Sequence, residues 1–379
     1  MSTEMFCVRP MIYMSKKGLD EILSGVESAC IVTDRFMCES GAVDYLTVPL
    51  EHRGIRYHIF DGVKPDPDLG TVAQIVNIYV DQKPDVLFAF GGGSPIDAAK
   101  AAVYMAGKLG AAKRCTFVAV PTTSGTGTEV TRFSVVTDPA TQTKYPMADP
   151  EMVPDAAILD CYLTCTVPPG VTADTGIDVF THAVESFVST AANDFSDACA
   201  EKAIKLCRSN LYKAYSQPDD PRARQAMHNA SCLAGIAFNN SGLGLNHGMA
   251  HTLGAHFHLP HGRCCGILLP YVMSYNAGCR TTLTPAAKKY ARIARLLNID
   301  GATFRQSTFS AVRSTKAFLQ KLDMPDCIKD AGVGRAEFLS QLDEMTEDAL
   351  NDATTATNPI VPDRDGVRDL FLRAYDGRL

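Results

Sequence analysis

Histidines gather in one short part of this 379-residue chain, the stretch NHGMAHTLGAHFHLPHG from Asn246 to Gly262. It contains five of the nine histidines: His247, His251, His256, His258 and His261. Imidazole nitrogens bind transition metals, and they also exchange protons near neutral pH. This stretch is therefore the first candidate for a site that performs chemistry.

A second segment, DTGIDVFTHAVESF, carries Asp178 and His182 four residues apart. On a helix this spacing puts both side chains on one face, and His247 and His251 repeat it. His261 follows a Leu-Pro step, so we expect it to begin the next helix. One carboxylate and three imidazoles would form a good site for Fe(II), Zn(II) or a similar divalent ion.

The residues alone leave open which histidines bind a metal. His247 and His251 would be the ligand pair of an H-E-x-x-H zinc hydrolase, but residues 247–251 read His-Gly-Met-Ala-His and lack the glutamate that acts as general base. Any of the five histidines could instead be a hydrogen-bonded core residue. His256 and His258 have no helical pairing, so for them we favour local packing or a place in a pocket wall.

Two loops in the first half are candidates for binding a dinucleotide. GGGSPIDAAK (91–100) follows an apolar strand pattern; Gly91 and Gly93 match the start of G-x-G-x-x-G, whereas Ile96 stands at the third position. Such a loop lets backbone N–H groups approach a pyrophosphate at a helix N-terminus, although a purely structural tight turn is the alternative. PTTSGTGTEVT (121–131) also leaves a strand, and without the lysine of a P-loop it disfavours nucleotide hydrolysis.

Asp34 ends the strand pattern ACIVTD. An acid in this place can bind a ribose 2′-hydroxyl and would repel a 2′-phosphate, which favours NAD over NADP. The alternative is an ordinary helix N-cap. The acid precedes the glycine loop, the reverse of the usual Rossmann order, so a shared dinucleotide would require a variant topology.

The elements that must position these residues change in character along the chain. In the first half, short apolar strand patterns alternate with helical stretches, which predicts a parallel sheet covered on both faces. SVVTDPATQTKYPMADP (134–150) interrupts this rhythm and indicates a hairpin. After TVPPG (166–170) helical periodicity dominates. We therefore expect an α/β domain over residues 1–167 and an all-α domain over residues 168–379.

Composition narrows the class of protein. The net charge of −6 and the lack of a basic stripe make nucleic acid an unexpected partner. No apolar run approaches the roughly 18 residues that a membrane span needs, and the first residues do not have the layout of a signal peptide. The thirteen cysteines are scattered without a CxxC pair, which is typical of reduced, mostly buried thiols in a cytoplasmic enzyme.

Taken together, GGGSPIDAAK, PTTSGTGTEVT, DTGIDVFTHAVESF and GLGLNHGMAHTLGAHFHLPHG resemble the iron-containing (group III) alcohol dehydrogenases over essentially the whole chain. Within that family FHLPHG, KYPM and ALNDATTATNP are most similar to the propanol dehydrogenase branch of propanediol-utilisation microcompartments. The resemblance implies a Rossmann-like NAD-binding domain followed by a helical metal-binding domain, the fold shared with dehydroquinate synthase. It also implies interconversion of short-chain aldehydes and primary alcohols with NADH/NAD, in a homo-oligomer (a dimer or larger).

The resemblance also assigns residues, motif by motif. The implied metal ligands are Asp178, His182, His247 and His261, whereas His251 matches a histidine near the nicotinamide and is a candidate proton relay. The implied dinucleotide contacts are Asp34, Gly91, Gly92, Gly93, Ser94, Thr122, Thr123, Thr126 and Lys144, and the implied substrate-pocket side chains are Phe133 and Phe238.

Three other functions are compatible with parts of this pattern. A dehydroquinate-synthase-like lyase would need a strongly basic site, yet Arg263 is the only cation near the histidines in the sequence. A glycerol-dehydrogenase-like enzyme would use the same two domains. A non-catalytic scaffold that binds microcompartment shell or lumen enzymes would leave the metal ligands and nucleotide loops without use. We therefore expect an enzyme of the cytoplasm or of a microcompartment lumen.

Overall fold

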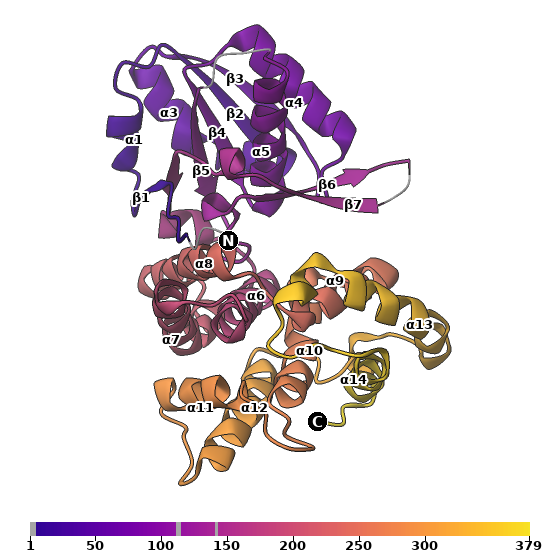
Figure 1. Ribbon diagram of the computed structural model, residues 1–379. Coiled ribbons are helices and arrows are strands. Elements are labelled where there is room, and N and C mark those ends of the chain that lie inside the picture. The colour runs from indigo at the N-terminus through magenta and orange to yellow at the C-terminus, as the bar shows by residue number, and fades with distance from the viewer. Residues whose placement is uncertain (1–4, 111–114, 141–142) are drawn as a thin grey trace. The chain divides into compact units, whose positions relative to one another are not determined.

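The computed structural model describes residues 5–110, 115–140 and 143–379 (Figure 1). The chain divides into two compact units. One spans Cys7–Thr166, and the other comprises Val167–Leu379 together with the described residues before Cys7. We call them the sheet unit and the helical unit.

The sheet unit is built on six parallel strands in the order β1-β8-β5-β4-β2-β3. These strands are β1 (Met11–Tyr13), β2 (Ser28–Asp34), β3 (Arg56–Val63), β4 (Val86–Gly91), β5 (Thr116–Pro121) and β8 (Ala156–Ile158). Because the strands are parallel, the ends of β2, β4 and β5 lie at the same edge of the sheet. Asp34, the glycine loop and the threonine loop all follow strands at this edge.

Helices cover both faces of this sheet (Figure 1). In β2, Cys30 and Val32 pack in the cluster that holds α4 and α5, whereas Ala29 and Ile31 pack in the cluster that holds α1 and α3. Burial on both faces explains why the central strand β4 is apolar throughout instead of alternating. The helices of the unit are α1 (Gly18–Ile22), α2 (Arg35–Glu39), α3 (Asp44–His52), α4 (Leu69–Gln82) and α5 (Gly93–Lys108).

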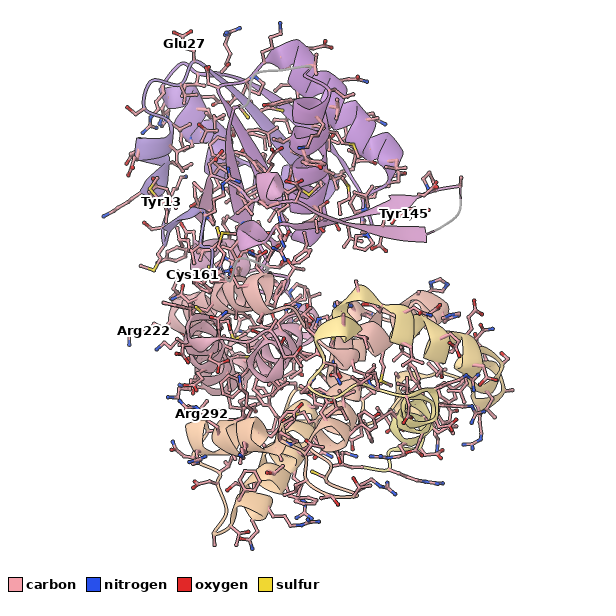
Figure 2. All side chains as sticks on the ribbon, in the orientation of Figure 1. Tyr13, Glu27, Tyr145, Cys161, Arg222 and Arg292 are labelled. Atoms are coloured by element: carbon pink, nitrogen blue, oxygen red, sulfur yellow. The ribbon has the colours of Figure 1, made fainter. Side chains whose placement is uncertain are left out.

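A hairpin and three short 3₁₀ turns complete the sheet unit. The antiparallel pair of β6 (Phe133–Asp138) and β7 (Thr143–Ala148) confirms the hairpin that the sequence predicts (Figure 1). Tyr145, on β7, is half exposed at the surface of this hairpin (Figure 2). The turns are η1 (Thr128–Val130), η2 (Pro150–Met152) and η3 (Cys161–Thr164).

The helical unit contains two apolar clusters that share α10 (His261–Asn276). Leu269 and Met273 of α10 join the cluster with α6, α7, α8, α11 and α12, whereas Leu268 and Val272 join the cluster with α9, α13 and α14. The helices are α6 (Pro169–Val188), α7 (Asp194–Ser216), α8 (Pro221–Ser241), α9 (Leu245–Phe257), α11 (Ala287–Leu296), α12 (Phe304–Lys321), α13 (Arg335–Asn351) and α14 (Arg364–Asp376), with 3₁₀ turns η4 (Lys329–Ala331) and η5 (Ala353–Thr357).

An exposed ion pair links two neighbouring helices of the helical unit. Arg292 of α11, labelled in Figure 2, pairs with Glu201 of α7. Among the described residues, every helix is too short or too polar to cross a lipid bilayer.

Candidate functional site

Three helices of the helical unit bring the predicted metal ligands together. α6 carries Asp178 and His182, α9 carries His247, and α10 begins at His261 after Pro260, as the Leu-Pro step predicts. The carboxylate is the common neighbour: Asp178 Oδ1 lies 3.8 Å from His182 Nε2, 3.6 Å from His247 Nε2 and 3.5 Å from His261 Nε2. The three imidazoles therefore gather around one carboxylate oxygen, Asp178 Oδ1.

The arrangement fits a divalent cation. Asp178 is buried, and its Oδ1 has no hydrogen-bond partner among the residues that the structure describes. A buried acceptor in that state is costly unless something compensates it. Ligand atoms about 2.0–2.1 Å from a tetrahedral ion are about 3.3–3.4 Å apart, close to the separations around Asp178. An ion at this point would satisfy the carboxylate that the protein leaves unpaired.

The pKa values of Asp178 and His261 shift toward the forms that bind a metal, whereas the neighbouring Cys265, Glu185 and Asp178 raise the pKa of His247. Burial alone would raise the pKa of Asp178, but the adjacent imidazoles hold that pKa well below its usual range. Desolvation within the cluster lowers the pKa of His261 to about 3, although 42% of its side chain reaches the surface. An ionised carboxylate and a neutral imidazole are the forms that bind metals.

Glu185 contacts one of the candidate ligands, and the sequence reasoning missed it. Its Oε2 contacts Nδ1 of His247, and its Oε1 accepts the backbone N–H of Asn246 (2.7 Å). The second ring nitrogen of His247 therefore points at Asp178. A carboxylate on the far nitrogen of a ligating histidine fixes the ring and increases its basicity. Glu185 is seven residues after Asp178 on the same helix, and this spacing was the available signal.

We call the side chains of Asp178, His182, His247 and His261 the donor group, and Cys265 lies against it. Its Sγ is 3.5 Å from His261 Nε2 and 3.8 Å from His247 Nε2. The candidate ligand atoms of Asp178, His247, His261 and Cys265 all lie within 4.8 Å of one another. Burial raises the pKa of the Cys265 thiol to about 12 in the protein without metal. The sequence signal for it is its position four residues after His261.

His251 lies beside the donor group but bonds elsewhere. Its ring stacks on that of His261, with 5.3 Å between centroids, and meets the ring of His247 edge-on at 5.9 Å. Its Nδ1 donates a hydrogen bond to Oδ2 of Asp352 (2.8 Å). This contact uses Nδ1 and leaves Nε2 for another partner. Asp352 is far away in sequence, and no pattern pointed to it.

His256 and His258 do not join the donor group among the described residues. His256 lies inside α9, and its Nε2 is 3.7 Å from Asp348 Oδ2 on α13. His258 adopts the left-handed conformation (φ 53°) that ends α9 and turns the chain toward Pro260. One histidine thus packs against a neighbouring helix and the other forms the turn between α9 and α10.

Two glycines allow the helices to approach closely enough for this site. A Cβ at Gly262 would lie 2.0 Å from the backbone oxygen of Asp174 on α6. A Cβ at Gly248 would lie 2.3 Å from Oγ1 of Thr355 in η5. The missing side chains therefore let α10 contact α6, and α9 contact the segment that carries Asp352.

Arg263 forms an ion pair with Asp174. Its Nε and one terminal nitrogen donate to the two carboxylate oxygens of Asp174, at 3.1 and 3.0 Å. This bidentate pair links α10 to α6 beside the donor group. The guanidinium near the histidines is thus bound to a carboxylate of the protein itself.

The sheet unit brings the predicted nucleotide loops together. Gly91 has φ 145°, a conformation open to glycine, and a Cβ there would lie 2.7 Å from Cγ of Pro95. Gly91 O accepts the N–H of Thr122 (2.9 Å), which links the two loops. A Cβ at Gly92 would contact the side chain of Thr123, and a Cβ at Gly93 would contact that of Thr126, so the two loops lie against each other. Ser94 lies in the first turn of α5, the helix that Gly92 caps without a side chain.

The two carboxylate oxygens of Asp34 are placed for the two roles considered above, the N-cap of a helix and contact with a ribose hydroxyl. One carboxylate oxygen, Oδ1, accepts the N–H of Met37 (3.0 Å) and caps α2. The other, Oδ2, is turned toward Gly91 and would lie 3.4 Å from a Cβ at that residue. The N-cap is therefore present, and it leaves the second oxygen beside the glycine loop.

The remaining predicted residues lie in different places. Lys144 pairs with Thr137 in the hairpin, but its side chain lies outside the described part of the chain. Phe133 begins β6 in the sheet unit. Phe238 lies on α8 in the helical unit, and its ring stacks on that of His182 with 4.5 Å between centroids. Phe238 is thus a neighbour of the donor group.

A buried polar network, which the sequence reasoning missed, holds the threonine loop. Lys100 Nζ donates to Thr128 Oγ1 (2.7 Å), to Thr131 O (2.7 Å) and to Phe133 O (2.9 Å). Asp97 accepts from Thr128 Oγ1 (2.6 Å). Burial lowers the pKa of Lys100 to about 8 and raises that of Glu129 to about 7. The motif GGGSPIDAAK thus also fastens the next loop to α5.

Comparisons with known proteins agree with this geometry. The family model "Iron-containing alcohol dehydrogenase" matches residues 13–161, and "Fe-containing alcohol dehydrogenase family, C-terminal" matches residues 172–375. The chain is 41% identical to the 1-propanol dehydrogenase PduQ of Citrobacter freundii, over 97% of this chain and 98% of that protein. It is 38% identical to the NADPH-dependent butanol dehydrogenase of Clostridium saccharobutylicum, over 97% and 96% of the two chains.

Solved structures give the same result. An alcohol dehydrogenase from Oenococcus oeni superposes with a TM-score of 0.90 at 31% identity, covering 98% of this chain and all of the other. The resemblance in the motifs, the two family models and this fold agree over nearly the whole length of the chain. The chain therefore belongs to the iron-containing alcohol dehydrogenase family, whose members interconvert alcohols and aldehydes.

Proposed function

We propose that this protein reduces short-chain aldehydes such as propanal to primary alcohols with NADH, and catalyses the reverse oxidation with NAD. The observation that carries the proposal is the unpaired, buried oxygen of Asp178, which faces three imidazoles. A propanol and a butanol dehydrogenase among the relatives support a small, apolar substrate.

Asp178, His182, His247 and His261 would hold Fe(II), and the same donor set also accepts Zn(II). When bound, the ion supplies a Lewis acid that polarises a carbonyl oxygen. Glu185 orients His247 toward Asp178 through the far ring nitrogen. Phe238, which stacks on His182, offers an apolar wall beside the donors, and Phe133 is our second candidate for the pocket.

The dinucleotide would bind along the carboxyl edge of the sheet. Its pyrophosphate fits the N-terminus of α5, where glycines 91–93 bring the backbone close and Ser94 begins the helix. Thr122, Thr123, Thr126 and Lys144 are the further contacts that we propose. Asp34 Oδ2 beside Gly91 suits a ribose hydroxyl, so we propose NAD as the preferred coenzyme. The nicotinamide supplies the hydride.

Reduction of an aldehyde also consumes a proton. His251 is the titratable group beside the donor set with its Nδ1 held by Asp352, which leaves Nε2 for proton exchange with solvent. The side chain is exposed, so water reaches it. We assign His251 the role of proton relay.

The setting in the cell is part of the proposal. The similarity to PduQ and the motifs FHLPHG and KYPM support a place in the cytoplasm or in the lumen of a bacterial microcompartment, beside shell or lumen enzymes. There the reaction would regenerate NAD. We propose a homo-oligomer, a dimer or larger, which light scattering of the purified chain would test.

The experiment that tests the function is a rate panel on anaerobically purified protein. Metal-stripped protein is reloaded with Fe(II) or Zn(II), and NADH oxidation is followed with ethanal, propanal and butanal. We expect turnover with reloaded protein and loss of both metal and turnover in Asp178→Ala. Retained metal in Asp178→Ala would refute the ligand assignment, and the absence of turnover with every aldehyde would refute the activity.

A further inference from the structure

Among the described residues, Asp178, His247, His261 and Cys265 form one close group of donor atoms, and His182 is not part of it. Cys265 lies on α10, one turn after His261, and its Sγ lies 3.5 Å from His261 Nε2 and 3.8 Å from His247 Nε2. The backbone oxygen of Cys265 accepts a hydrogen bond from Asn246 Nδ2 (3.1 Å), which fixes this part of α10 against α9. The thiol is therefore held in place beside two candidate ligands.

These separations match those between ligands that share an ion. On an ion with five donors, a sulfur at about 2.3 Å and a nitrogen at about 2.0–2.1 Å lie about 3.1–3.8 Å apart for angles of about 90–120°. The Sγ–Nε2 distances of 3.5 and 3.8 Å are of that size. Independently, Asp178 Oδ1 is buried in the same group without a hydrogen-bond partner in the described chain.

The neighbouring cysteine shows that this placement is specific. Cys264 and Cys265 are both fully buried on α10. Cys264 Sγ, however, lies next to Gly254 of α9 and 4.0 Å from Leu259 O, in the segment between α9 and α10. Only the second thiol of the pair joins the group formed with Asp178, His247 and His261.

We propose that Cys265 is a further metal donor of this centre, binding the ion as a thiolate. The inference rests on the metal centre proposed above and adds a ligand to it. On binding, the S–H bond breaks, a sulfur–metal bond forms, and the proton leaves to solvent without any change of oxidation state.

A thiolate ligand would change which metal ion the centre prefers. Two anionic donors, Asp178 and Cys265, neutralise a divalent ion, whereas the carboxylate with three imidazoles would leave it one positive charge. Thiolate is also the softer donor, and it favours Zn(II) over harder ions. Removal of Cys265 should therefore move the preference of the centre from Zn(II) toward Fe(II).

The test uses metal spectroscopy on the full chain and requires no turnover. Protein reloaded with Co(II) should show a near-ultraviolet thiolate-to-cobalt charge-transfer band. Protein reloaded with Zn(II) should show a sulfur scatterer at about 2.3 Å in X-ray absorption. Both signals should disappear in Cys265→Ser, while Cys264→Ser, which removes the adjacent buried thiol, should retain them.

Each outcome has a distinct meaning. A metal-loaded wild-type protein with only nitrogen and oxygen scatterers would overturn the role of Cys265 and leave the four-ligand centre intact. Failure of the wild type to bind metal would instead overturn the proposed function. A sulfur signal that persists in Cys265→Ser would also overturn the inference. Competition between Zn(II) and Fe(II) gives a second measure. The ratio of bound Zn(II) to bound Fe(II) should fall in Cys265→Ser and stay unchanged in Cys264→Ser.

Discussion

Asp352 Oδ2 lies 2.8 Å from His251 Nδ1, although 101 residues separate them in the chain. The other oxygen, Oδ1, accepts from the backbone N–H (2.8 Å) and the hydroxyl (2.6 Å) of Thr354, so η5 holds the carboxylate in place. Burial would raise the pKa of Asp352, but these hydrogen bonds hold it well below its usual range. Asp352 is therefore an ionised positioning residue for the proposed proton relay.

Asp352→Asn should impair proton transfer without removing metal. Asparagine can still cap η5, but it no longer fixes one tautomer of His251. We expect kcat to fall by up to about 100-fold, with a shifted pH profile and an unchanged metal content. Asp348→Asn, which alters the carboxylate near His256, is the matched control. Equal kcat values and pH profiles in Asp352→Asn and wild type would contradict this role.

Glu185→Gln should weaken metal binding. Glutamine can still accept the backbone N–H of Asn246 but loses the charge that faces Nδ1 of His247. Loss of such a partner of a ligating histidine lowers metal affinity about 10- to 100-fold. Competition with a chelator measures this change, and Glu201→Gln on the surface of α7 is the control. A chelator midpoint equal to that of the wild type would show that Glu185 does not support the ligand.

Asp34→Gly should relax the discrimination against NADPH. The change removes the negative charge beside Gly91. Glycine is tolerated at an N-cap, so the loss of the Asp34 side chain should destabilise α2 by only a few tenths of a kcal/mol. Asp34→Asn keeps a capping side chain and also removes the charge. We expect the ratio of kcat/KM for NADH to that for NADPH to fall in both variants. If the ratio stays constant in both, Asp34 acts only as the N-cap of α2.

Glu129→Gln should stabilise the protein at neutral pH. Burial raises the folded-state pKa of Glu129 from 4.5 to about 7, so the folded chain binds this proton more tightly than the unfolded chain. The stabilisation is complete below pH 4.5 and is lost as the pH rises through 7. Glutamine imitates the protonated form, so the variant should gain up to about 3 kcal/mol over the wild type between pH 4.5 and pH 7.5.

Thermal midpoints at pH 5 and pH 7.5 check this prediction. The wild type should lose more stability than Glu129→Gln between the two values. Glu39→Gln, an exposed substitution on α2, should behave as the wild type does. If the thermal midpoints of Glu129→Gln and wild type differ by the same amount at both pH values, the raised pKa of Glu129 is contradicted.

Local patterns predicted the parts of the site that depend on neighbours in sequence. The i, i+4 spacing of Asp178 and His182 put both on one face of α6, and the Leu-Pro step placed His261 at the start of α10. The alternation of strands and helices gave the parallel sheet and the edge where the glycine and threonine loops meet. In each case the relevant contact follows from helix or strand geometry over a few residues.

The residues that support the ligands were not predicted, because their partners are brought in by tertiary packing. Asp352 reaches His251 from the segment after α13, and nothing near either residue indicates the pair. Cys265 was one cysteine among thirteen, most of which are simply buried. Glu185 carried a usable spacing from Asp178, but a charged residue on a helix is usually solvated.

The contact of Gly262 with Asp174 has a consequence for redesign of this centre. Residue 262 stands between His261 and the rest of α10, and its Cα hydrogen faces the backbone of α6 where a methyl group would overlap a carbonyl oxygen. Even alanine would push the two helices apart and carry His261 away from Asp178. A library of variants aimed at new metals or larger substrates can change the metal ligands and the residues that line the pocket, but it has to keep glycine at position 262.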